Sequence, residues 1–226
     1  MKKRIILWAL CICFSSTLLA QETETEQKKE RKHAIGVSGG TGGFGADYSY
    51  KLNKSFTVTA RFNKLNFKAE DIEQEIDGEN LLFDAEANFQ SIDLVISYYP
   101  FKSGFRIIGG IGSFSNNELN MVAEFTESIN IGDVPFTTNE VGVISIGNKW
   151  KKTAPYLGIG FGRAIPKNKR LGFGLEMGTY FAGSPEVTLD ATGIIEQTAT
   201  QQPLVEEALS ELKYLPYIMF RLSYSI

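Results

Sequence analysis

Apolar and polar residues alternate with a period of two through most of the chain, and the apolar positions are rich in aromatic and branched side chains. This pattern is typical of β-strands that have one apolar and one polar face. Clear runs lie at residues 44–52, 56–63, 91–98, 105–111, 157–162, 171–178 and 218–226. They approach the length of about nine to eleven residues that a tilted strand needs to cross a bilayer.

The connections between these runs alternate in length. Short turns are predicted near residues 53, 102 and 168, and long polar loops near residues 70–80, 126–140 and 190–213. Short periplasmic turns and long outer loops are typical of outer-membrane barrels. Residues 203–213 begin with a proline and carry leucines at helical spacing, so they predict one short helix before the last strand.

These features predict an all-β fold, an antiparallel up-and-down transmembrane β-barrel of eight strands. Seven runs are clear, and bacterial single-chain barrels have an even number of strands. The eighth comes from dividing the glycine-rich start into strands at 34–39 and 44–52. The alternative is one long first strand and a further strand at 186–192. Phase changes near Lys64 and Gln90 indicate bulges or extensions beyond the membrane, so ten or twelve strands stay open.

The start of the chain has the layout of a cleavable signal peptide. Three basic residues at positions 2–4 precede an apolar stretch over 5–19, a small residue follows at Ala20, and the sequence then becomes strongly polar. We therefore expect cleavage near Ala20, a polar disordered lead-in over residues 21–33, and one barrel domain over residues 34–226. Such a protein is localised to the cell outer membrane of a Gram-negative bacterium.

The composition of the mature chain excludes several classes of function. Both cysteines, Cys11 and Cys13, lie in the signal peptide, so disulfides and cysteine-bound metals are excluded. Removal of the signal leaves 20 Lys and Arg against 26 Asp and Glu, a net charge of about −6. Nucleic-acid partners need a surface of clustered basic charge, and nothing in this acidic chain suggests one.

The polar face of the strands separates a membrane barrel from a soluble sheet. It holds glycines and serines together with single charges, which are Arg61, Asp93, Arg106, Glu176 and Arg221, with Asp47 as a further candidate. We expect these charges in the lumen, because an arginine facing lipid costs about 2–4 kcal/mol at the midplane. Aromatic residues near the run ends predict interfacial girdles: Tyr48, Tyr50, Tyr98, Tyr99, Phe101, Tyr217 and Tyr224.

Three features could carry chemistry, and each fits a structural interpretation better. Residues 40–45 match G-x-G-x-x-G, but a strand follows, so no helix N-terminus can receive a pyrophosphate. Residues 73–84 approximate an EF-hand loop but lack the flanking helices and the final Glu. His33 is the single histidine and lies in the lead-in, so a barrel-wall hydrolase lacks its base or metal ligand. We expect no enzyme, cofactor or metal site.

Several segments together resemble a known group of proteins. They are Pro100–Phe101, Gly104–Arg106, Ala154–Gly162, Gly172–Gly174, Phe181–Val187 and Tyr214–Tyr224. Across nearly the whole mature chain they resemble the small Gram-negative outer-membrane β-barrels, within them a sparsely characterised group of envelope proteins. The resemblance implies outer-membrane lipid and, through the C-terminal strand, the outer-membrane assembly machinery as partners. Such barrels usually end on Phe or Trp, whereas this chain ends on Ile226, a difference that concerns assembly and not topology.

Three functions follow from this sequence. The first is a structural or interaction barrel whose lumen is plugged by the mixed charges, while the long loops contact an unknown partner outside the cell. The second is a narrow porin-like channel for small solutes. The third is a soluble periplasmic lipocalin-like barrel with a ligand inside. Against the third, Trp150 is the one tryptophan of the mature chain and lies far from the N-terminal strand where lipocalins carry theirs.

Overall fold

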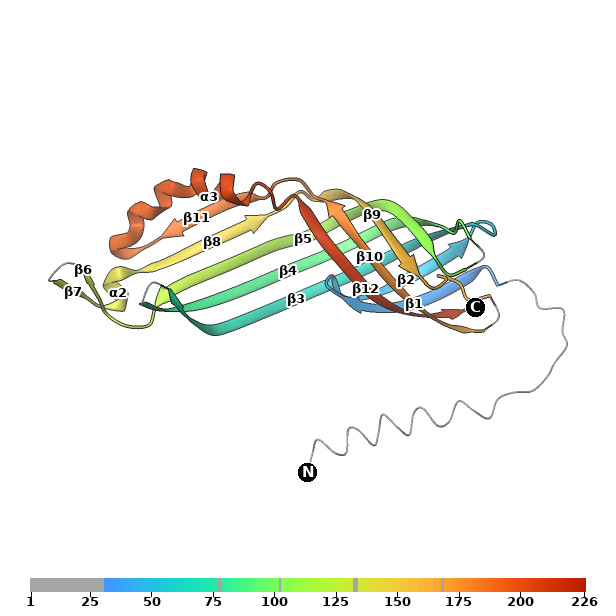
Figure 1. Cartoon of the computed structure of the whole chain (residues 1–226), viewed down its shortest axis with the longest axis horizontal. Coiled ribbons are helices and arrows are strands. Elements are labelled where there is room, and N and C mark those ends of the chain that lie inside the picture. The colour runs from blue at the N-terminus through green and yellow to red at the C-terminus, as the bar shows by residue number, and fades with distance from the viewer. Residues whose placement is uncertain (1–30, 77–78, 102, 132–133, 168) are drawn as a thin grey trace, which may run out of the picture. The chain divides into compact units, whose positions relative to one another are not determined.

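A computed structural model describes residues 31–76, 79–101, 103–131, 134–167 and 169–226. Antiparallel pairings close a ring in the order β1, β2, β3, β4, β5, β9, β10, β12 and back to β1 (Figure 1). These strands are β1 His33–Gly40, β2 Gly43–Lys51, β3 Phe56–Ile76, β4 Glu79–Tyr98, β5 Arg106–Phe125, β9 Thr153–Phe161, β10 Leu171–Phe181 and β12 Tyr214–Ser225. The predicted antiparallel barrel is therefore confirmed, and the ring has eight strands and not ten or twelve. The predicted signal peptide and residues 21–30 of the lead-in lie outside the described residues.

Two further strands lengthen the wall without adding to the ring. β8 (Val143–Lys149) pairs with the far half of β5, while β9 pairs with the near half of β5. β11 (Glu186–Ala191) pairs with β8 beyond the end of β10. β8 and β9 thus form one wall strand that is interrupted at Trp150, and β10 and β11 form the next. The predicted strand at 186–192 exists, but it continues β10.

The glycine-rich start divides into two strands as predicted. Gly43 has a φ of 83°, which a glycine adopts at little cost and which permits the tight turn at Thr41–Gly42. A Cβ on Gly42 would lie 2.6 Å from Cε2 of Tyr217, so this turn packs closely against the inside of the barrel. No helix N-terminus follows the G-x-G-x-x-G segment, since β2 begins directly at Gly43.

Three strands are much longer than a membrane crossing requires. β3, β4 and β5 project beyond the ring and form, together with β8 and β11, a sheet that we name the extension (Figure 1). The predicted polar loop at 70–80 is wrong, because β3 continues to Ile76 and β4 starts at Glu79. The charged run hides the alternation there, and a register shift between Ala69 and Ile72 breaks its phase, with Asp71 at a φ of 57°. The bulge predicted near Gln90 is present between β4 and β5.

The remaining elements all lie in the connections of the extension. They are the hairpin β6 (Ile129–Ile131) and β7 (Val134–Phe136), the turn of helix α2 (Thr138–Val141), the 3-10 helix η1 (Gly193–Gln201) and the helix α3 (Gln202–Leu209). The predicted helix before the last strand is confirmed, although it begins at Gln202 and ends at Leu209. Both η1 and α3 pack against β11. No helix among the described residues is long and apolar enough to span a membrane.

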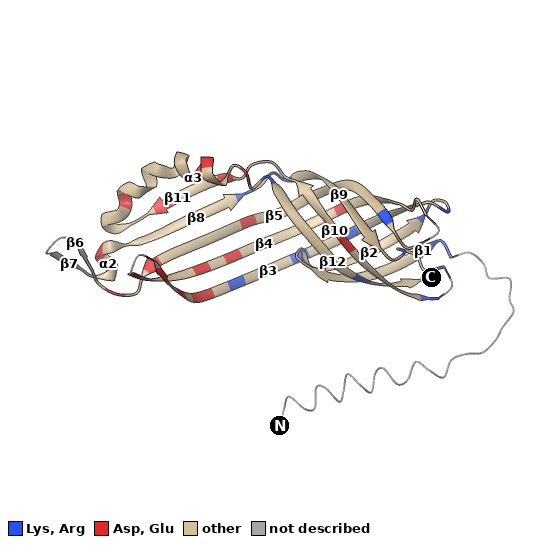
Figure 2. Cartoon of the chain, in the orientation of Figure 1, with Lys and Arg blue, Asp and Glu red and all other residues tan. Residues whose placement is uncertain are grey.

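The outside of the ring is an apolar surface that no described segment covers. Among its members at least 38% exposed are Ile35, Val37, Phe44, Phe62, Ile92, Leu94, Ile96, Ile107, Ile111, Leu157, Ile159, Phe161, Phe173, Phe220 and Leu222. Apolar outward and polar inward faces are the arrangement of a membrane barrel, whereas a soluble lipocalin-like barrel needs the reverse. Charged residues of β3, β4 and β5 lie mostly in the extension, where Asp and Glu predominate (Figure 2).

Candidate functional site

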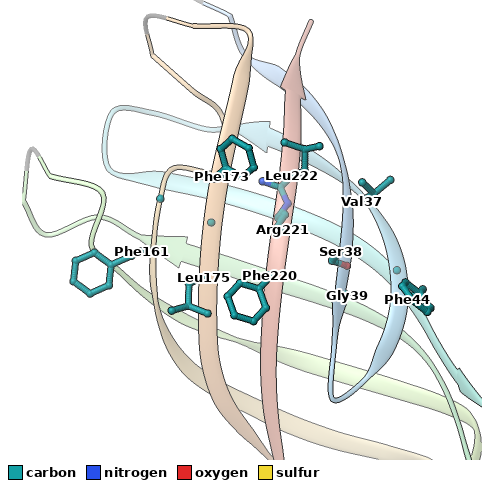
Figure 3. A pocket seen from close by; sticks show the side chains of 13 residues that line it. Val37, Ser38, Gly39, Phe44, Phe161, Phe173, Leu175, Phe220, Arg221 and Leu222 are labelled. Atoms are coloured by element: carbon teal, nitrogen blue, oxygen red, sulfur yellow. The ribbon is translucent and has the colours of Figure 1, made fainter. Parts of the chain in front are cut away.

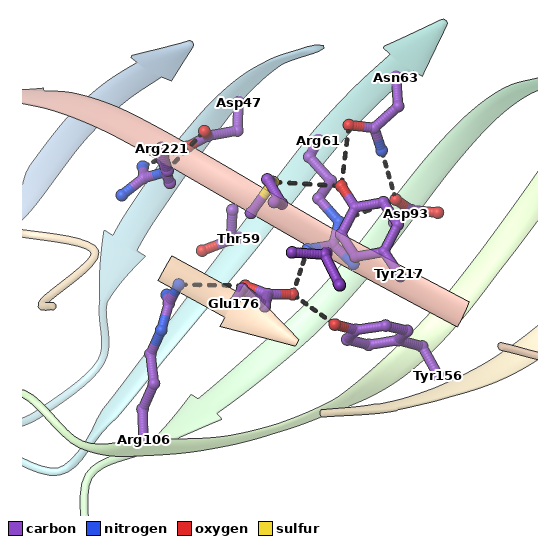
Figure 4. Close-up of polar contacts among 12 residues, drawn as sticks. Asp47, Thr59, Arg61, Asn63, Asp93, Arg106, Tyr156, Glu176, Tyr217 and Arg221 are labelled. Atoms are coloured by element: carbon purple, nitrogen blue, oxygen red, sulfur yellow. Dashed lines mark hydrogen bonds and ion pairs between the residues drawn. The ribbon is translucent and has the colours of Figure 1, made fainter. Parts of the chain in front are cut away.

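An ion-pair network crosses the middle of the barrel. Arg61 of β3, Asp93 of β4 and Glu176 of β10 point inward, because each occupies the polar phase of its strand. The Nε of Arg61 donates to Oδ2 of Asp93 at 2.8 Å, and its Nη1 donates to Oε1 of Glu176 at 2.6 Å (Figure 4). Their side chains are at most 3% exposed. One guanidinium therefore joins opposite walls of the ring.

Glu176 is the centre of this network. Its Oε2 accepts a hydrogen bond from Nη2 of Arg106 at 3.0 Å, and its Oε1 accepts a second from the hydroxyl of Tyr156 at 2.7 Å. One carboxylate thus lies between two guanidinium groups. With Asp93 included, two cations face two anions, so the charges of this layer balance.

Tyrosines complete the layer around Arg61. The Tyr180 hydroxyl donates to Oδ2 of Asp93 at 2.9 Å. The Arg61 guanidinium lies 4.8 Å from the ring centroid of Tyr156 and 4.9 Å from that of Tyr217, which are cation–π distances. The three rings also pack on one another, with centroids 4.7–5.7 Å apart. Paired charges and aromatic rings therefore occupy the lumen at this level.

Two tyrosines lie elsewhere than the sequence predicts. The prediction of interfacial girdles is wrong for Tyr217 and Tyr99, which are only 4% and 5% exposed and lie inside the barrel. For Tyr217 a signal existed, because it shares the inward phase of β12 with Arg221. Tyr99 follows β4, where the alternation ends, so its direction depends on the contacts of the turn.

A second layer closes the base, which is the end of the ring where β1 begins and β12 ends. The Nε of Arg221 donates to Oδ2 of Asp47 at 2.7 Å, and its Nη2 bonds the other carboxylate oxygen. Its Nη1 donates to the carbonyl of Ala164 at 2.9 Å. Ala164 and Ile165 are 1% and 6% exposed, so the turn between β9 and β10 folds into the base. The sequence predicted only a short turn there.

All five predicted lumen charges are therefore buried and paired inside the barrel. Four of them, Arg61, Asp93, Arg106 and Glu176, belong to one network. Arg221 belongs to the separate pair with Asp47.

The outside of the ring carries a shallow apolar recess of about 760 Å³ over β1, β12, β10 and β9 (Figure 3). Phe44, Phe161, Phe173 and Phe220 surround it. Gly39 has no side chain to fill the recess, and the ring of Phe44 packs over that glycine. The recess lies on the outward face of the ring, away from the lumen.

The other candidate motifs do not form a chemical site. His33 is the first residue of β1 and not part of a lead-in, and its Nδ1 lies 2.5 Å from the Tyr48 hydroxyl. Residues 73–76 and 79–84 are strands and not a calcium loop. Within the described residues, no group of three or more His, Cys, Asp and Glu could hold a metal ion.

Solved structures share this fold. CarO of Acinetobacter baumannii matches with a TM-score of 0.64 and 18% identity, covering 89% of this chain and 100% of its own. CarO2 of the same organism matches with a TM-score of 0.62 and 18% identity, covering 88% and 100%. No family model matches the chain, and no curated protein matches its sequence. The chain therefore has the fold of the small eight-stranded β-barrels of Gram-negative outer membranes, as its sequence predicted.

Proposed function

We propose that this protein is a non-enzymatic integral barrel of the outer membrane, with a sealed lumen, that anchors the extension as an interaction surface. The observation that carries the proposal is the closure of the lumen by two successive layers. The Arg61 layer fills the middle, and the pair of Arg221 and Asp47 with the buried turn at Ala164 fills the base.

The sealed lumen follows from the width of such a ring. An eight-stranded barrel has an interior just wide enough for side chains to fill. Here the inward side chains are large. Arg61, Arg106 and Tyr156 bond to Glu176. The rings of Tyr180 and Tyr217 pack on that of Tyr156 and on each other. Hydrated ions passing this level must displace groups that already pair with one another, so the barrel serves as an anchor rather than a conduit.

Two partners belong to the membrane part of this function. The apolar outside of the ring fits outer-membrane lipid, and Phe220, Leu222 and Tyr224 keep the outward alternation of the last strand up to Ile226. We propose recognition of this strand by the outer-membrane assembly machinery. A protein recovered from the soluble periplasm, with a gel mobility that boiling does not change, contradicts the membrane assignment.

Conductance in a planar lipid bilayer tests the sealed lumen. The native barrel is expected to insert without discrete current steps. Arg106→Ala and Glu176→Ala remove side chains from the central layer and are expected to introduce or enlarge steps. Met177→Ala, a change on the outward face beside Glu176, is the matched control. Stable steps from the native protein contradict the proposal.

A narrow channel for small solutes is the second candidate function. Among the described residues, the buried Asp93 Oδ1 and Arg106 Nε make no hydrogen bond. Buried polar atoms without protein partners are sites where water binds. In this candidate, water bound beside Asp93 and Arg106 forms part of the conducting path. Ohmic conductance by the native protein, unchanged in Glu176→Ala, favours this candidate.

A further inference from the structure

The inward face of the wall changes from polar to apolar above the ring. On β3 the inward positions Thr59, Arg61 and Asn63 are followed by Leu65 and Phe67. The register continues without a shift through this change, since Asn63 pairs with Ser91 and Leu65 pairs with Phe89. On β4, β5 and β8 the inward positions of the extension are likewise apolar: Phe83, Ala85, Ala87, Phe89, Leu119, Met121, Ala123, Ile144 and Ile146.

No helix or strand of the described part of the chain packs over this apolar face along the whole of β3, β4 and β5. The helices η1 and α3 pack at the other edge, against β11. The opposite wall is short, because the β1–β2 hairpin turns at Thr41–Gly42 and β12 begins only at Tyr214 (Figure 1). Phe67, Ile72 and Met121 are consequently 54%, 41% and 39% exposed. Large exposed apolar patches are rare on surfaces in water, and they commonly mark interaction sites or ligand-binding grooves.

At its foot the face leads into a pocket in the mouth, the end of the ring opposite the base. The pocket has a volume of about 210 Å³ and is lined by Thr41, Gly42, Asn63, Phe89, Ser91, Phe114, Tyr180, Leu215, Pro216 and Tyr217. Phe89 belongs to both the face and the pocket, so the two are continuous. The floor offers no free charge, because Asn63 and Tyr180 hydrogen-bond to Asp93, which pairs with Arg61.

The extension carries an excess of acidic residues. Residues 64–90 contain eight Asp and Glu and two Lys, and residues 116–127 contain three Glu and no basic residue. Glu70, Glu86 and Glu124 alternate with the apolar inward residues and so face away from the apolar surface into water. A negative electrostatic field therefore surrounds the uncharged apolar face. This field attracts cations in the water beside the sheet.

We propose that the pocket and the apolar face bind a cationic amphiphile with a single linear alkyl chain. The chain end occupies the mouth pocket, the chain follows the inward face of β3, β4 and β5, and the positive head remains in water within the acidic field. The pocket is smaller than the 300–1,000 Å³ typical of sites for compact drug-sized ligands, which favours a slender chain. Beyond it, residues 79–90 of β4 extend the apolar face by roughly 35–40 Å.

This inference deepens the proposed function, because it rests on a sealed barrel beneath the pocket and gives the extension a ligand class. Trp150 is a suitable reporter. Its ring centroid lies 6.1 Å from that of Phe89, which lines the pocket, and it is the one tryptophan after residue 20. Binding at the mouth is expected to change its fluorescence.

The experiment titrates the barrel, refolded in phosphatidylcholine nanodiscs, with alkyltrimethylammonium ions of eight to fourteen carbons below their micelle concentrations. Saturable binding is expected, with affinity rising about fourfold per methylene, the value that corresponds to about 0.8 kcal/mol per buried CH₂. Alkanoates of equal length are expected to bind at least tenfold more weakly, and added salt is expected to narrow that difference. Absence of saturable binding, or equal affinity for both head charges at low salt, overturns the proposal.

Two variants locate the site. Ser91→Phe fills the pocket and is expected to weaken binding at least tenfold. Ile92→Phe, its neighbour on the outward face, is the matched control and is expected to bind as the native protein does. Equal binding by both variants overturns the location, because the amphiphile then reaches Trp150 from the bilayer.

A second route keeps the test valid where Ser91→Phe does not refold. Phe89→Ala enlarges the pocket, so the preferred chain is expected to lengthen by two or three methylenes in calorimetric titrations; an unchanged preference overturns the proposal. A native barrel that neither conducts nor binds amphiphile contradicts this inference alone, whereas a conducting barrel contradicts the proposed function.

Discussion

Replacement of Glu176 by glutamine tests the sealed lumen through its effect on the free energy of unfolding of the barrel. The variant keeps the size of the side chain but removes the one negative charge between Arg61 and Arg106. Arg61 retains Asp93, whereas Arg106 loses the carboxylate that balanced its charge. The Glu176 and Arg106 side chains are each 3% exposed, so water does not replace the lost partner.

The expected cost follows from that burial. Removal of one partner of a buried ion pair destabilises a protein by about 3–5 kcal/mol, because the other charge stays uncompensated. A pair in contact with water contributes only about 0.2–1 kcal/mol. The two regimes differ enough for one equilibrium measurement to separate a closed lumen from a hydrated one.

Urea unfolding of the barrel in phosphatidylcholine vesicles, followed by Trp150 fluorescence, supplies the measurement. With an m-value of about 2 kcal/mol/M, the midpoint of Glu176→Gln is expected to fall by roughly 1.5–2.5 M. The double variant Glu176→Gln with Arg106→Met removes the stranded cation and is expected to recover at least about 2 kcal/mol. Met177→Leu on the outward face is the control, expected within about 1.5 kcal/mol of the native protein.

Two results refute the reasoning. A loss below about 1 kcal/mol in Glu176→Gln means that water already compensates Arg106. Additive effects of the two substitutions mean that Glu176 and Arg106 do not interact energetically.

Two further predictions concern the mouth and the extension. Gly42→Ala places a Cβ 2.6 Å from the Tyr217 ring and is expected to lower the free energy of unfolding in urea by about 1–3 kcal/mol. In the control Gly147→Ala, the nearest atom lies 3.4 Å from the new Cβ, so this variant is expected to be tolerated. Equal losses of stability in the two variants contradict the close packing of the first turn. The N–H and hydroxyl of Thr137 hold the pKa of the Glu140 carboxyl below its usual value. This cap is therefore present at neutral pH and lost as the pH falls through the lowered pKa. The protection factors of the α2 amides, which are the ratios of the exchange rate of an unfolded chain at the same pH to the observed rate, are expected to fall in acid, and Glu140→Gln should remove that dependence.

The ring could be predicted from the sequence because lipid imposes a strict rule. Outward positions must be apolar in the membrane, so the phase of a run also gives the direction of each charge. On that basis the sequence assigns Arg106 and Glu176 to the lumen. It does not show that the two side chains lie close together within the ring. Register joins residues 70 positions apart, and no local pattern records it.

The phase changes near Lys64 and Gln90 indicate bulges or extensions beyond the membrane, but the strand over 70–76 could not be predicted, because its environment differs. Beyond the ring the alternation is reversed, since charged residues point outward and Leu65 and Phe67 point inward. A run whose outward face is apolar in the ring therefore continues as a strand whose outward face is polar. The buried turn at Ala164–Ile165 was missed for another reason. Its position depends on tertiary contacts, the Arg221 bond to the Ala164 carbonyl and the Ala164 N–H bond to the Tyr99 hydroxyl.

Cysteine accessibility tests the sealed lumen most directly, since the chain has no cysteine after residue 20. Ser97→Cys is nearly isosteric and introduces a thiol at an inward position that is 1% exposed. Lys54→Cys, in the exposed turn between β2 and β3, is the positive control for labelling. With a charged, membrane-impermeant thiol reagent applied to both sides of the bilayer, the account predicts rapid labelling at position 54 and none at position 97 until the barrel is unfolded. Labelling of the folded Ser97→Cys barrel at a rate comparable to Lys54→Cys contradicts a sealed lumen.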